Sequence, residues 1–331
     1  MELTGIYKAI LKRMAAGQFF SGQELANELN VSRASIWNYL KKLEAAGFEF
    51  HAVKGKGTRL KRPLELLDKQ QIISGVSAQR QHLVQNIEVL DSCSSTNLHI
   101  AQQHSLKPLP NGSICMAEMQ TKGRGRLGKT WVSPYGQNLY VSFLWSFNGG
   151  ISSLSGLSLA CGVAVCHALK ELGMSGHGLK WPNDVLWEGK KLGGILVDIQ
   201  GESQGGYTAI VGIGLNYQMS SAASNAIDQP WSDVSKASGG MVGRNKLAAC
   251  LLEHVLQVLH GYEEGGLLPH VAPWNEYDCY KQQPVRIISG EQFEEGFAGG
   301  ISNTGELLLL KPDGSVKSIV SGEVSLRLQA T

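Results

Sequence analysis

Hydrophobic positions near the start of the chain repeat at helical spacing in two short stretches, each preceded by a serine. Ser21 opens a Ser-x-x-Glu capping box before the first stretch, and Ser32 can cap a second helix over residues 33 to 43. The apolar positions on the inner faces are Leu25, Ala26, Leu29, Ile36, Leu40 and Leu43. The pattern predicts a helix-turn-helix, with residues 33 to 43 as its recognition helix.

Two short strands are predicted directly after these helices, over residues 48 to 53 and 58 to 62. The Lys54-Gly55-Lys56-Gly57 turn between them predicts a hairpin wing. Residues 1 to 63 carry 11 Lys or Arg against 5 Glu, although the whole chain has a net charge of only +2. A basic wing beside a recognition helix favours DNA over a protein-contact hairpin as the partner of this module.

The residues expected to meet DNA lie on the exposed face of the recognition helix, near the helix caps and in the wing. They are Ser21, Ser32, Arg33, Ser35, Trp37, Asn38, Lys41, Lys54 and Lys56. One such module reaches only one half-site, so we expect a homodimer on a symmetric operator DNA.

Beyond residue 63 the pattern becomes a mixture of strands and helices, which predicts an α+β body. We expect a helical connector over residues 64 to 85, a long apolar helix over 155 to 172 and an amphipathic helix over 244 to 262. Short strands separated by turn residues follow at 285–288, 293–299, 306–310, 316–320 and 324–328. These changes predict domains over residues 1–63, 64–270 and 271–331.

Composition is that of an ordinary globular protein, with 43% hydrophobic and 18% charged residues among 331. The six cysteines form no C-x-x-C pair, which favours free thiols in a reducing compartment. The sequence has no signal peptide, and no apolar run in it looks long enough to span a bilayer. We therefore expect a cytoplasmic protein with no membrane partner.

A glycine-rich basic loop, Gly123-Arg124-Gly125-Arg126-Leu127-Gly128-Lys129-Thr130-Trp131, satisfies two nucleotide-binding patterns at once. It matches both the P-loop and the G-x-G-x-x-G dinucleotide fingerprint. Both patterns need a helix directly after the last glycine, but the following segment is rich in turn residues and leads to a strand over 139–145. If the loop binds an anion, basic side chains must therefore neutralise its charge. The alternative is a solvated surface loop with no ligand. Residues 119–170 contain no Asp or Glu, and their basic residues are Lys122, Arg124, Arg126, Lys129 and Lys170.

Two further segments carry polar groups in positions that suit ligand binding. Lys180-Trp181-Pro182-Asn183-Asp184 suits a rigid turn at a strand end rather than a packed interior. Lys191 precedes an apolar strand that contains Gly193-Gly194, where a ligand could lie against the backbone. A β-bulge and a solvated strand end would explain the same residues.

Ordered motifs over essentially the whole chain resemble those of the biotin protein ligases. The matching segments are Ser95-Thr96-Asn97, Gln120, the Gly-Arg-Gly-Arg-x-Gly loop with Trp131, Lys180 to Asp184, Lys191-Leu192-x-Gly194-Ile195, and Gly212-Ile213-Gly214-Leu215-Asn216. With the N-terminal module, the chain is similar to the bifunctional bacterial members that also act as biotin operon repressors. Ser94 stands where the family usually has Asp, and Lys129 stands where arginine is commoner.

The resemblance implies a winged helix-turn-helix, a class II synthetase-like ligase domain and a small SH3-like β-barrel. It implies these biotin-binding residues: Ser95, Thr96, Asn97, Gln120, Gly123, Arg124, Gly125, Arg126, Lys191, Gly194 and Gly214. The residues it implies for binding the adenylate or ATP are Trp131, Asn183, Asn216 and Trp231. The catalytic residues it implies are Arg124, Arg126, Lys191 and Asp184, the last also a candidate Mg²⁺ ligand.

The resemblance further implies a reaction in two steps. Biotin and MgATP give biotinoyl-5'-AMP and pyrophosphate, and a lysine of the biotin carboxyl carrier protein of acetyl-CoA carboxylase then takes the biotinoyl group. The adenylate would also act as corepressor and favour the dimer that binds operator DNA. Two alternatives are a P-loop ATPase with a DNA-binding head, and a biotin-sensing repressor that has lost the chemistry.

Overall fold

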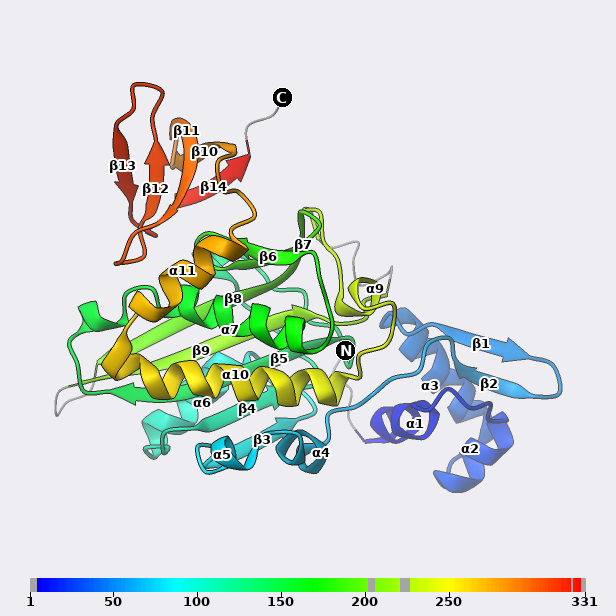
Figure 1. The fold of residues 1–331 in the computed structure, drawn as a ribbon. Coiled ribbons are helices and arrows are strands. Elements are labelled where there is room, and N and C mark those ends of the chain that lie inside the picture. The colour runs from blue at the N-terminus through cyan, green and yellow to red at the C-terminus, as the bar shows by residue number, and fades with distance from the viewer. Residues whose placement is uncertain (1–4, 202–205, 221–226, 323, 329–331) are drawn as a thin grey trace.

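The computed structural model describes residues 5–201, 206–220, 227–322 and 324–328. The chain forms a small helical module at the N-terminus, a large central sheet covered by helices, and a second sheet at the C-terminus (Figure 1). The mixed α/β organisation that the pattern predicts is therefore confirmed.

The N-terminal module consists of α1 (Ile6–Met14), α2 (Gly22–Glu28) and α3 (Arg33–Ala45), followed by the hairpin β1 (Phe50–Val53) and β2 (Gly57–Leu60). The Ser21 side chain accepts from the Glu24 N–H, and the Glu24 carboxylate accepts from the Ser21 N–H, so the capping box is complete. Ser32 caps α3 through the Ser35 N–H. The helix-turn-helix and the hairpin lie where the sequence predicts them.

The central sheet has the strand order β3-β4-β5-β9-β8-β7-β6. Its strands are β3 (Asn86–Leu90), β4 (Ser113–Ala117), β5 (Asn138–Phe147), β6 (His177–Lys180), β7 (Asp184–Trp187), β8 (Lys190–Gly201) and β9 (Tyr207–Asn216). Only the β3–β4 pair is parallel among the pairs of described strands in this sheet. The middle strands β5, β9 and β8 are long, and they bring the motif segments to neighbouring positions.

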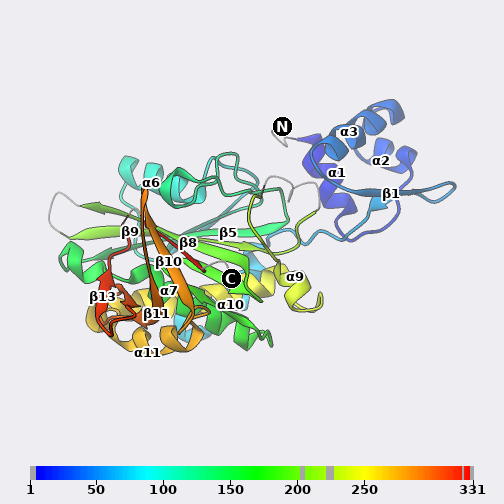
Figure 2. The same cartoon turned by 90° about the horizontal axis from the view of Figure 1, so that it is seen from above.

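Helices cover both faces of this sheet, as the view from above shows (Figure 2). One face carries α6 (Thr96–Leu106), and the other carries α7 (Leu157–Glu171), α10 (Arg244–Gly265) and α11 (Leu268–Tyr277). The segment Ile151–Glu171 is long and apolar enough to cross a membrane, so the expectation that no such run exists is wrong. Most of this segment is buried, and α7 is the core helix between the sheet and the outer helices.

The C-terminal sheet has the order β13-β12-β11-β10-β14 and is antiparallel throughout. Its strands are β10 (Pro284–Ser289), β11 (Gln292–Ile301), β12 (Leu307–Leu310), β13 (Val316–Ile319) and β14 (Val324–Leu328). Its apolar side chains join the core of the central domain. Trp181 is 1% exposed and donates from Nε1 to the Gly305 carbonyl oxygen at 3.1 Å. The Lys180–Asp184 turn is thus partly packed interior, contrary to the sequence expectation, because this second sheet covers it.

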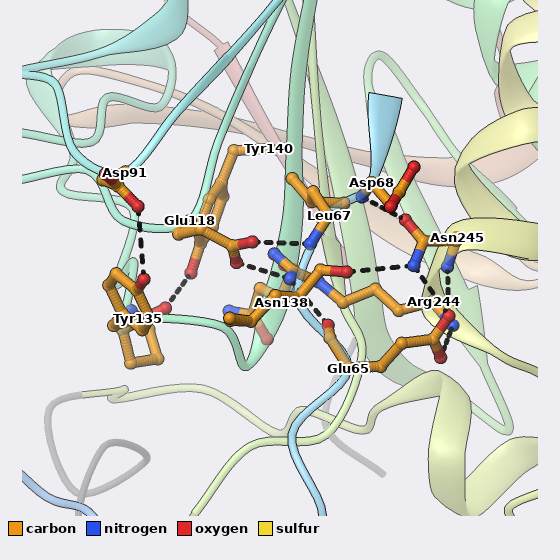
Figure 3. Close-up of polar contacts among 12 residues, drawn as sticks. Glu65, Leu67, Asp68, Asp91, Glu118, Tyr135, Asn138, Tyr140, Arg244 and Asn245 are labelled. Carbon is orange, nitrogen blue, oxygen red and sulfur yellow. Dashed lines mark hydrogen bonds and ion pairs between the residues drawn. The ribbon is translucent and has the colours of Figure 1, made fainter. Parts of the chain in front are cut away.

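The connector between the first two parts is less helical than the sequence suggests. Residues 63–67 are not helical, and only α4 (Lys69–Ser74) and α5 (Ala78–Gln81) form. Pro63 disfavours helix just before it, and Gly75 and Ser77 interrupt the helical pattern after it. The Glu65 carboxylate instead accepts from the N–H groups of Arg244 and Asn245, which lie in the first turn of α10 (Figure 3). The connector therefore caps a helix that lies far away in the sequence.

Candidate active site

A cavity of about 710 Å³ opens over the central strands β7, β8 and β9. The basic loop, the Lys180–Asp184 turn and strand β14 of the C-terminal sheet complete its wall. The predicted site residues that line it are Ser95, Thr96, Asn97, Gln120, Arg124, Gly125, Arg126, Trp131, Asn183, Asp184, Lys191, Gly194 and Gly214. Residues separated by more than 100 positions in the sequence thus share one cavity.

The basic loop folds back on itself instead of opening a helix. Arg124 pairs with Thr130 as an antiparallel bridge, and the Gly125 N–H donates to the Lys129 carbonyl oxygen at 2.7 Å. A single short 3-10 turn, Arg126–Gly128, forms the tip. Within residues 129–137, all of which the structure describes, no helix occurs. This geometry contradicts both nucleotide patterns and leaves side chains to supply the positive charge.

The two arginines of the loop are held by different partners. Arg124 forms an ion pair with Asp198 on β8 at 2.7 Å, and its side chain is 40% exposed. Arg126 donates to the carbonyl oxygens of Ser321 and Gly322, which precede β14, at 2.9 and 2.8 Å. Burial lowers the pKa of Arg126 from its usual value, since the low-polarity surroundings disfavour its charge. Both guanidinium groups line the cavity, and an anion could compete for them.

Two lysines approach the cavity from β6 and β8, the strands on either side of β7. Lys191 forms an ion pair with Asp184 at 2.7 Å, and both side chains are less than one-fifth exposed. Lys180 ends β6, and its Nζ lies 5.6 Å from the Tyr280 ring centroid. Burial lowers the pKa of Lys180 to about 8, and the nearby cations Arg327 and Lys191 act in the same direction. A ligand with negative charge would relieve this repulsion.

The Ser95-Thr96-Asn97 segment begins α6 and is locked into a hydrogen-bonded network. Gln120 Oε1 accepts from the Thr96 N–H at 2.9 Å, and Gln120 Nε2 donates to Ser133 Oγ at 3.1 Å. Asn97 Nδ2 donates to Asp198 Oδ2 at 3.0 Å. Asp198 thus joins this network to Arg124 on the basic loop. The polar end of the cavity has rigid donors and acceptors, as recognition of a neutral polar head group requires.

Gly214 on β9 makes room for the indole of Trp131, and Gly194 on β8 lies beside the ring. A Cβ on Gly214 would lie 2.7 Å from the Trp131 ring, and one on Gly194 would lie 3.6 Å from it. Gly123 is buried, and a Cβ there would lie 2.4 Å from the Trp131 carbonyl oxygen. Trp131 Nε1 is buried without a hydrogen-bond partner. This indole nitrogen faces Gly214 on β9, where a side chain would collide with it.

The remaining predicted adenylate residues stabilise the backbone around the cavity. Asn183 Nδ2 donates to the Ile195 carbonyl oxygen at 2.9 Å, and Asn216 Nδ2 donates to that of Ser232 at 3.0 Å. Asn216 and Trp231 line a smaller adjoining cavity of about 60 Å³ that shares Trp131 and Lys191 with the larger one. Lys236 Nζ lies 4.1 Å from the Trp231 ring centroid.

Several cavity residues were not expected from the sequence. Arg327 on β14 and Tyr280 reach the cavity from the C-terminal sheet and the segment before it. Asp198 is not among the lining residues, but it pairs with Arg124, which is. Lys180 was part of a recognised motif, but only its depth in the cavity marks it as a site residue. The alternation of apolar and polar residues in β14 does not show that Arg327 faces the cavity of another domain.

The predicted DNA-contacting residues lie together on α3 and the β1–β2 hairpin. Trp37 is 62% exposed, and Lys41 Nζ lies 5.9 Å from its ring centroid. The exposed positions also include Arg33, Asn38, Lys54 and Lys56, whereas Ser35 is half-buried. The hydroxyls of Ser21 and Ser32 are engaged as helix caps.

Family models match three parts of the chain. The Biotin/lipoate A/B protein ligase family matches residues 89–216, an HTH domain matches residues 8–59, and a Biotin protein ligase C terminal domain matches residues 283–327. The relative named bifunctional ligase/repressor BirA from Salmonella typhimurium is 35% identical over 99% of each chain. The one from Escherichia coli is 34% identical over 96% of each chain. The chain belongs to the bifunctional biotin ligase/repressor family.

As a member of that family, the chain is a biotin protein ligase that carries an N-terminal helix-turn-helix repressor domain. Its fold is also similar to a solved biotin protein ligase from Aquifex aeolicus in complex with biotin and ATP. That structure has a TM-score of 0.62 and 29% identity, and the match covers 74% of this chain and 100% of the other. The family resemblance that the motifs suggested is confirmed.

Proposed function

We propose that the 710 Å³ cavity binds biotin and ATP and joins them as biotinoyl-5'-AMP. A carboxylate oxygen of biotin attacks the α-phosphorus of ATP, a new O–P bond forms, and the bond to the β-phosphate oxygen breaks to release pyrophosphate. The observation that carries the proposal is the convergence of Arg124, Arg126 and Lys191 on one cavity that is also lined by the hydrogen-bonded pair Thr96 and Gln120.

Electrostatics explain why this reaction needs basic side chains around the cavity. Two anions must approach one another, and negative charge grows on the phosphate oxygens during the attack. Lys191 and Arg124 are held ready by Asp184 and Asp198, so little reorganisation is needed when phosphate or carboxylate oxygens take over these contacts. The buried Lys180 adds a further positive charge on the same side.

The biotin head group would occupy the polar end, close to Ser95, Thr96, Asn97 and Gln120. Trp131 lies against Gly214 and Gly194, where it would cover the ligand, and Trp231 flanks the adjoining small cavity. Shielding from water matters here because a mixed anhydride hydrolyses readily.

Asp184 fits a magnesium ion that is held mainly by substrate oxygens. Mg²⁺ in nucleotide sites usually takes one or two carboxylates together with phosphates and water, and Asp184 offers one carboxylate at the cavity wall. When bound, the ion would neutralise phosphate charge. The Asp184–Lys191 pair would open, which frees Lys191 for the ligand.

We further propose that a lysine of the biotin carboxyl carrier protein takes the biotinoyl group in a second step. Its Nζ attacks the acyl carbon, the bond to the phosphate oxygen breaks, AMP leaves and the amine loses a proton. Two carboxylates line the cavity, those of Asp184 and Asp228, and we assign the proton to Asp184 because it already pairs with Lys191 at 2.7 Å. Asp184→Asn should therefore slow transfer from preformed adenylate at least tenfold, measured as single-turnover biotinylation of the carrier. Unchanged transfer would remove Asp184 from this role.

Biotin-dependent exchange of labelled pyrophosphate into ATP tests the first step. Exchange that requires biotin and Mg²⁺, and that falls sharply in Lys191→Met, would support adenylate formation. Phosphate release without biotin would instead favour a P-loop ATPase, although no helix follows the loop in residues 129–137 as described here. Biotin binding without exchange would favour a sensor that has lost the chemistry.

We also propose how the N-terminal module recognises DNA. The exposed face of α3 and the hairpin lysines support operator recognition by a ligand-bound homodimer in the cytoplasm, with biotinoyl-5'-AMP as corepressor. The wing contributes Lys54 and Lys56 to phosphate contacts. We also propose domain limits at 1–63, 64–270 and 271–331, a class II synthetase-like central domain and an SH3-like barrel for the last one.

A further inference from the structure

We propose that the outer helical layer carries a binding site for a borderline-soft divalent metal ion, Zn²⁺, between α7 and α10. Four side chains form it: His167 and Glu171 on α7, and Cys250 and His254 on α10. The site lies outside the ligand cavity and is independent of the reaction proposed above.

Helical spacing places these donors in two matched pairs. His167 and Glu171 are four residues apart on α7, and Cys250 and His254 are four residues apart on α10. Residues at this spacing point to the same side of a helix, one turn apart. The two helices lie against one another along the outer face of the central sheet (Figure 1). Each helix therefore presents a pair of potential ligands to the other.

Distances bring the donors within reach of one ion. The ligand atoms of Glu171, Cys250 and His254 lie within 4.8 Å of one another, and His254 Nε2 is 2.8 Å from Glu171 Oε2. The ring centroid of His167 is 6.0 Å from that of His254. Tetrahedral Zn²⁺ with sulfur at about 2.3 Å and nitrogen at about 2.0 Å needs donor atoms roughly 3.3–3.5 Å apart. Rotamer adjustments of ångström size would suffice for the three closest donors, with a rotation of the His167 ring for the fourth.

The donor set and its exposure select the class of ion. Two imidazoles, one thiolate and one carboxylate suit Zn²⁺, whereas Mg²⁺ and Ca²⁺ prefer oxygen ligands only. Cys250 is 7% exposed, His254 has a side-chain exposure of 19% and Glu171 one of 60%. The site is thus buried at the sulfur and open at the carboxylate, which provides an entry path.

Protonation favours His167 as a ligand and opposes the thiol of Cys250. Burial, together with the nearby His254 and Lys170, lowers the pKa of His167, so its neutral, ligating form prevails at neutral pH. Burial and Glu171 raise the pKa of Cys250 to about 12, so in the absence of metal it stays a thiol and donates to the Ala168 carbonyl oxygen at 3.4 Å. Binding must therefore release the thiol proton.

A second group of donors in the described residues provides the internal control. Glu88, His99 and Cys115 also lie within 4.8 Å of one another, but they come from three separate elements, β3, α6 and β4. No helical pairing supports a fourth ligand there, and we assign no metal to it. A variant of Cys115 thus tests whether any metal signal arises from the α7–α10 site.

The test is a Co²⁺ titration of the metal-free, full-length protein under a non-thiol reductant, followed by displacement with Zn²⁺. We expect one Co²⁺ per chain, intense visible bands of tetrahedral cobalt and a sulfur-to-cobalt charge-transfer band. Cys250→Ala should abolish the charge-transfer band, and His254→Ala should weaken Co²⁺ binding at least tenfold. His260→Ala, an exposed histidine on the same helix, and Cys115→Ala should leave both unchanged.

Pyrophosphate exchange shows whether a variant that has lost the metal site is still folded. Pyrophosphate exchange should stay within twofold in Cys250→Ala and His254→Ala, and Zn²⁺ should raise the thermal midpoint of the unchanged protein but of neither variant. If Cys250→Ala fails to fold, Cys250→Ser replaces it. Absence of a charge-transfer band, or its loss in Cys115→Ala with retention in Cys250→Ala, would overturn the proposal and leave a His254–Glu171 ion pair beside a core cysteine.

Discussion

Arg244 shows at the residue scale how a buried charge can hold separate segments together. Its side chain is fully buried and donates to Glu118 at 2.5 Å, to the Asn138 carbonyl oxygen and to the Glu65 carbonyl oxygen (Figure 3). One guanidinium group therefore joins four segments: the connector, β5, α10 and the residue directly after β4. Removing one partner of such a pair leaves an uncompensated buried charge.

Arg244→Met should lower the free energy of unfolding by about 3–5 kcal/mol, because Glu118 would remain buried without its counter-charge. Urea unfolding followed by tryptophan fluorescence measures the loss. The double variant Arg244→Met with Glu118→Gln should recover part of it, since no charge is then left unpaired. A loss below 1 kcal/mol in the single variant would mean that solvent reaches Glu118.

Lys180 predicts a pH dependence of nucleotide binding. Its pKa is about 8, so the side chain is charged below that pH and neutral above it. If its charge attracts phosphate, kcat/KM for ATP should fall above pH 8, by roughly tenfold per pH unit at the steepest part. Lys180→Met should show a lower kcat/KM without this step. The control is Lys170→Met on the exposed end of α7, where the step should persist, and an unchanged profile in Lys180→Met would exclude the role.

Sequence reasoning succeeds at residues whose signal is local. Ser21 and Ser32 cap helices as their spacing predicts, and the turn residues after Thr130 correctly exclude a helix there. Arg244 gives no such signal, because its partners Glu118 and Glu65 lie 126 and 179 residues away. Arg244 is the first residue of the amphipathic pattern of α10, a position where a charged residue is usually exposed to solvent. Burial of a charge depends on long-range packing that no short window of sequence contains.

At the scale of elements, the basic loop and the hairpin contrast in how their cations are used. Arg124 and Arg126 are engaged by Asp198 and by two carbonyl oxygens, so they are fixed in place. Lys54 and Lys56 are exposed at the tip of the β1–β2 hairpin. Fixed cations suit a reaction that requires defined geometry, and exposed cations at a hairpin tip suit contact with a polyanion.

Neutralising the hairpin lysines should reduce the salt dependence of DNA binding. Each phosphate contact contributes about 0.9 to the slope of log K against log salt concentration. Lys54→Gln with Lys56→Gln should therefore lower the slope by about 1.8 per module. Fluorescence anisotropy with operator DNA at several salt concentrations measures it. Lys61→Gln is the matched control, because Lys61 already pairs with Glu49 at 3.1 Å, and an equal reduction there would contradict the assignment.

At the scale of elements the sequence also located most secondary structure but not how it packs. The five C-terminal strands and the helix over 244–262 lie close to their predicted positions. The contribution of β14 to the ligand cavity was not predictable, because Arg327 reaches it only after the second sheet docks on the first domain. The connector over 64–85 looked helical because its composition is, whereas the contacts of Glu65 with the start of α10 hold its first residues out of a helix.

The whole molecule is joined at the boundary between the DNA-binding module and the ligase domain. Tyr135, which follows the basic loop, is 2% exposed and packs in the N-terminal core beside Phe48, with ring centroids 6.2 Å apart. Its hydroxyl donates to Asp91 at 3.4 Å, and Lys8 on α1 forms an ion pair with the same carboxylate at 2.5 Å. Tyr135 thus connects the segment after the basic loop to the core of the helical module.

Tyr135→Ala should loosen this junction while the ligase fold persists. Deleting a buried aromatic side chain costs about 3–5 kcal/mol of packing, here concentrated in the N-terminal core. Differential scanning calorimetry should then resolve a separate, earlier transition for the module, and cleavage after Lys61 by trypsin should accelerate. Tyr135→Phe, which keeps the ring, is the control and should behave like the unchanged protein. A single transition shifted as a whole would show that the module does not unfold by itself.

The place of β14 in the cavity wall also fixes when, during synthesis, each activity can begin. The helical module has its helices and hairpin by residue 60 and gains Tyr135, which completes its core, well before the last strands are made, and domains generally fold in order from the N-terminus. The ligand cavity cannot close until translation has passed Arg327. A nascent chain would therefore carry a folded DNA-binding module long before it could take up the ligand that is proposed to control it.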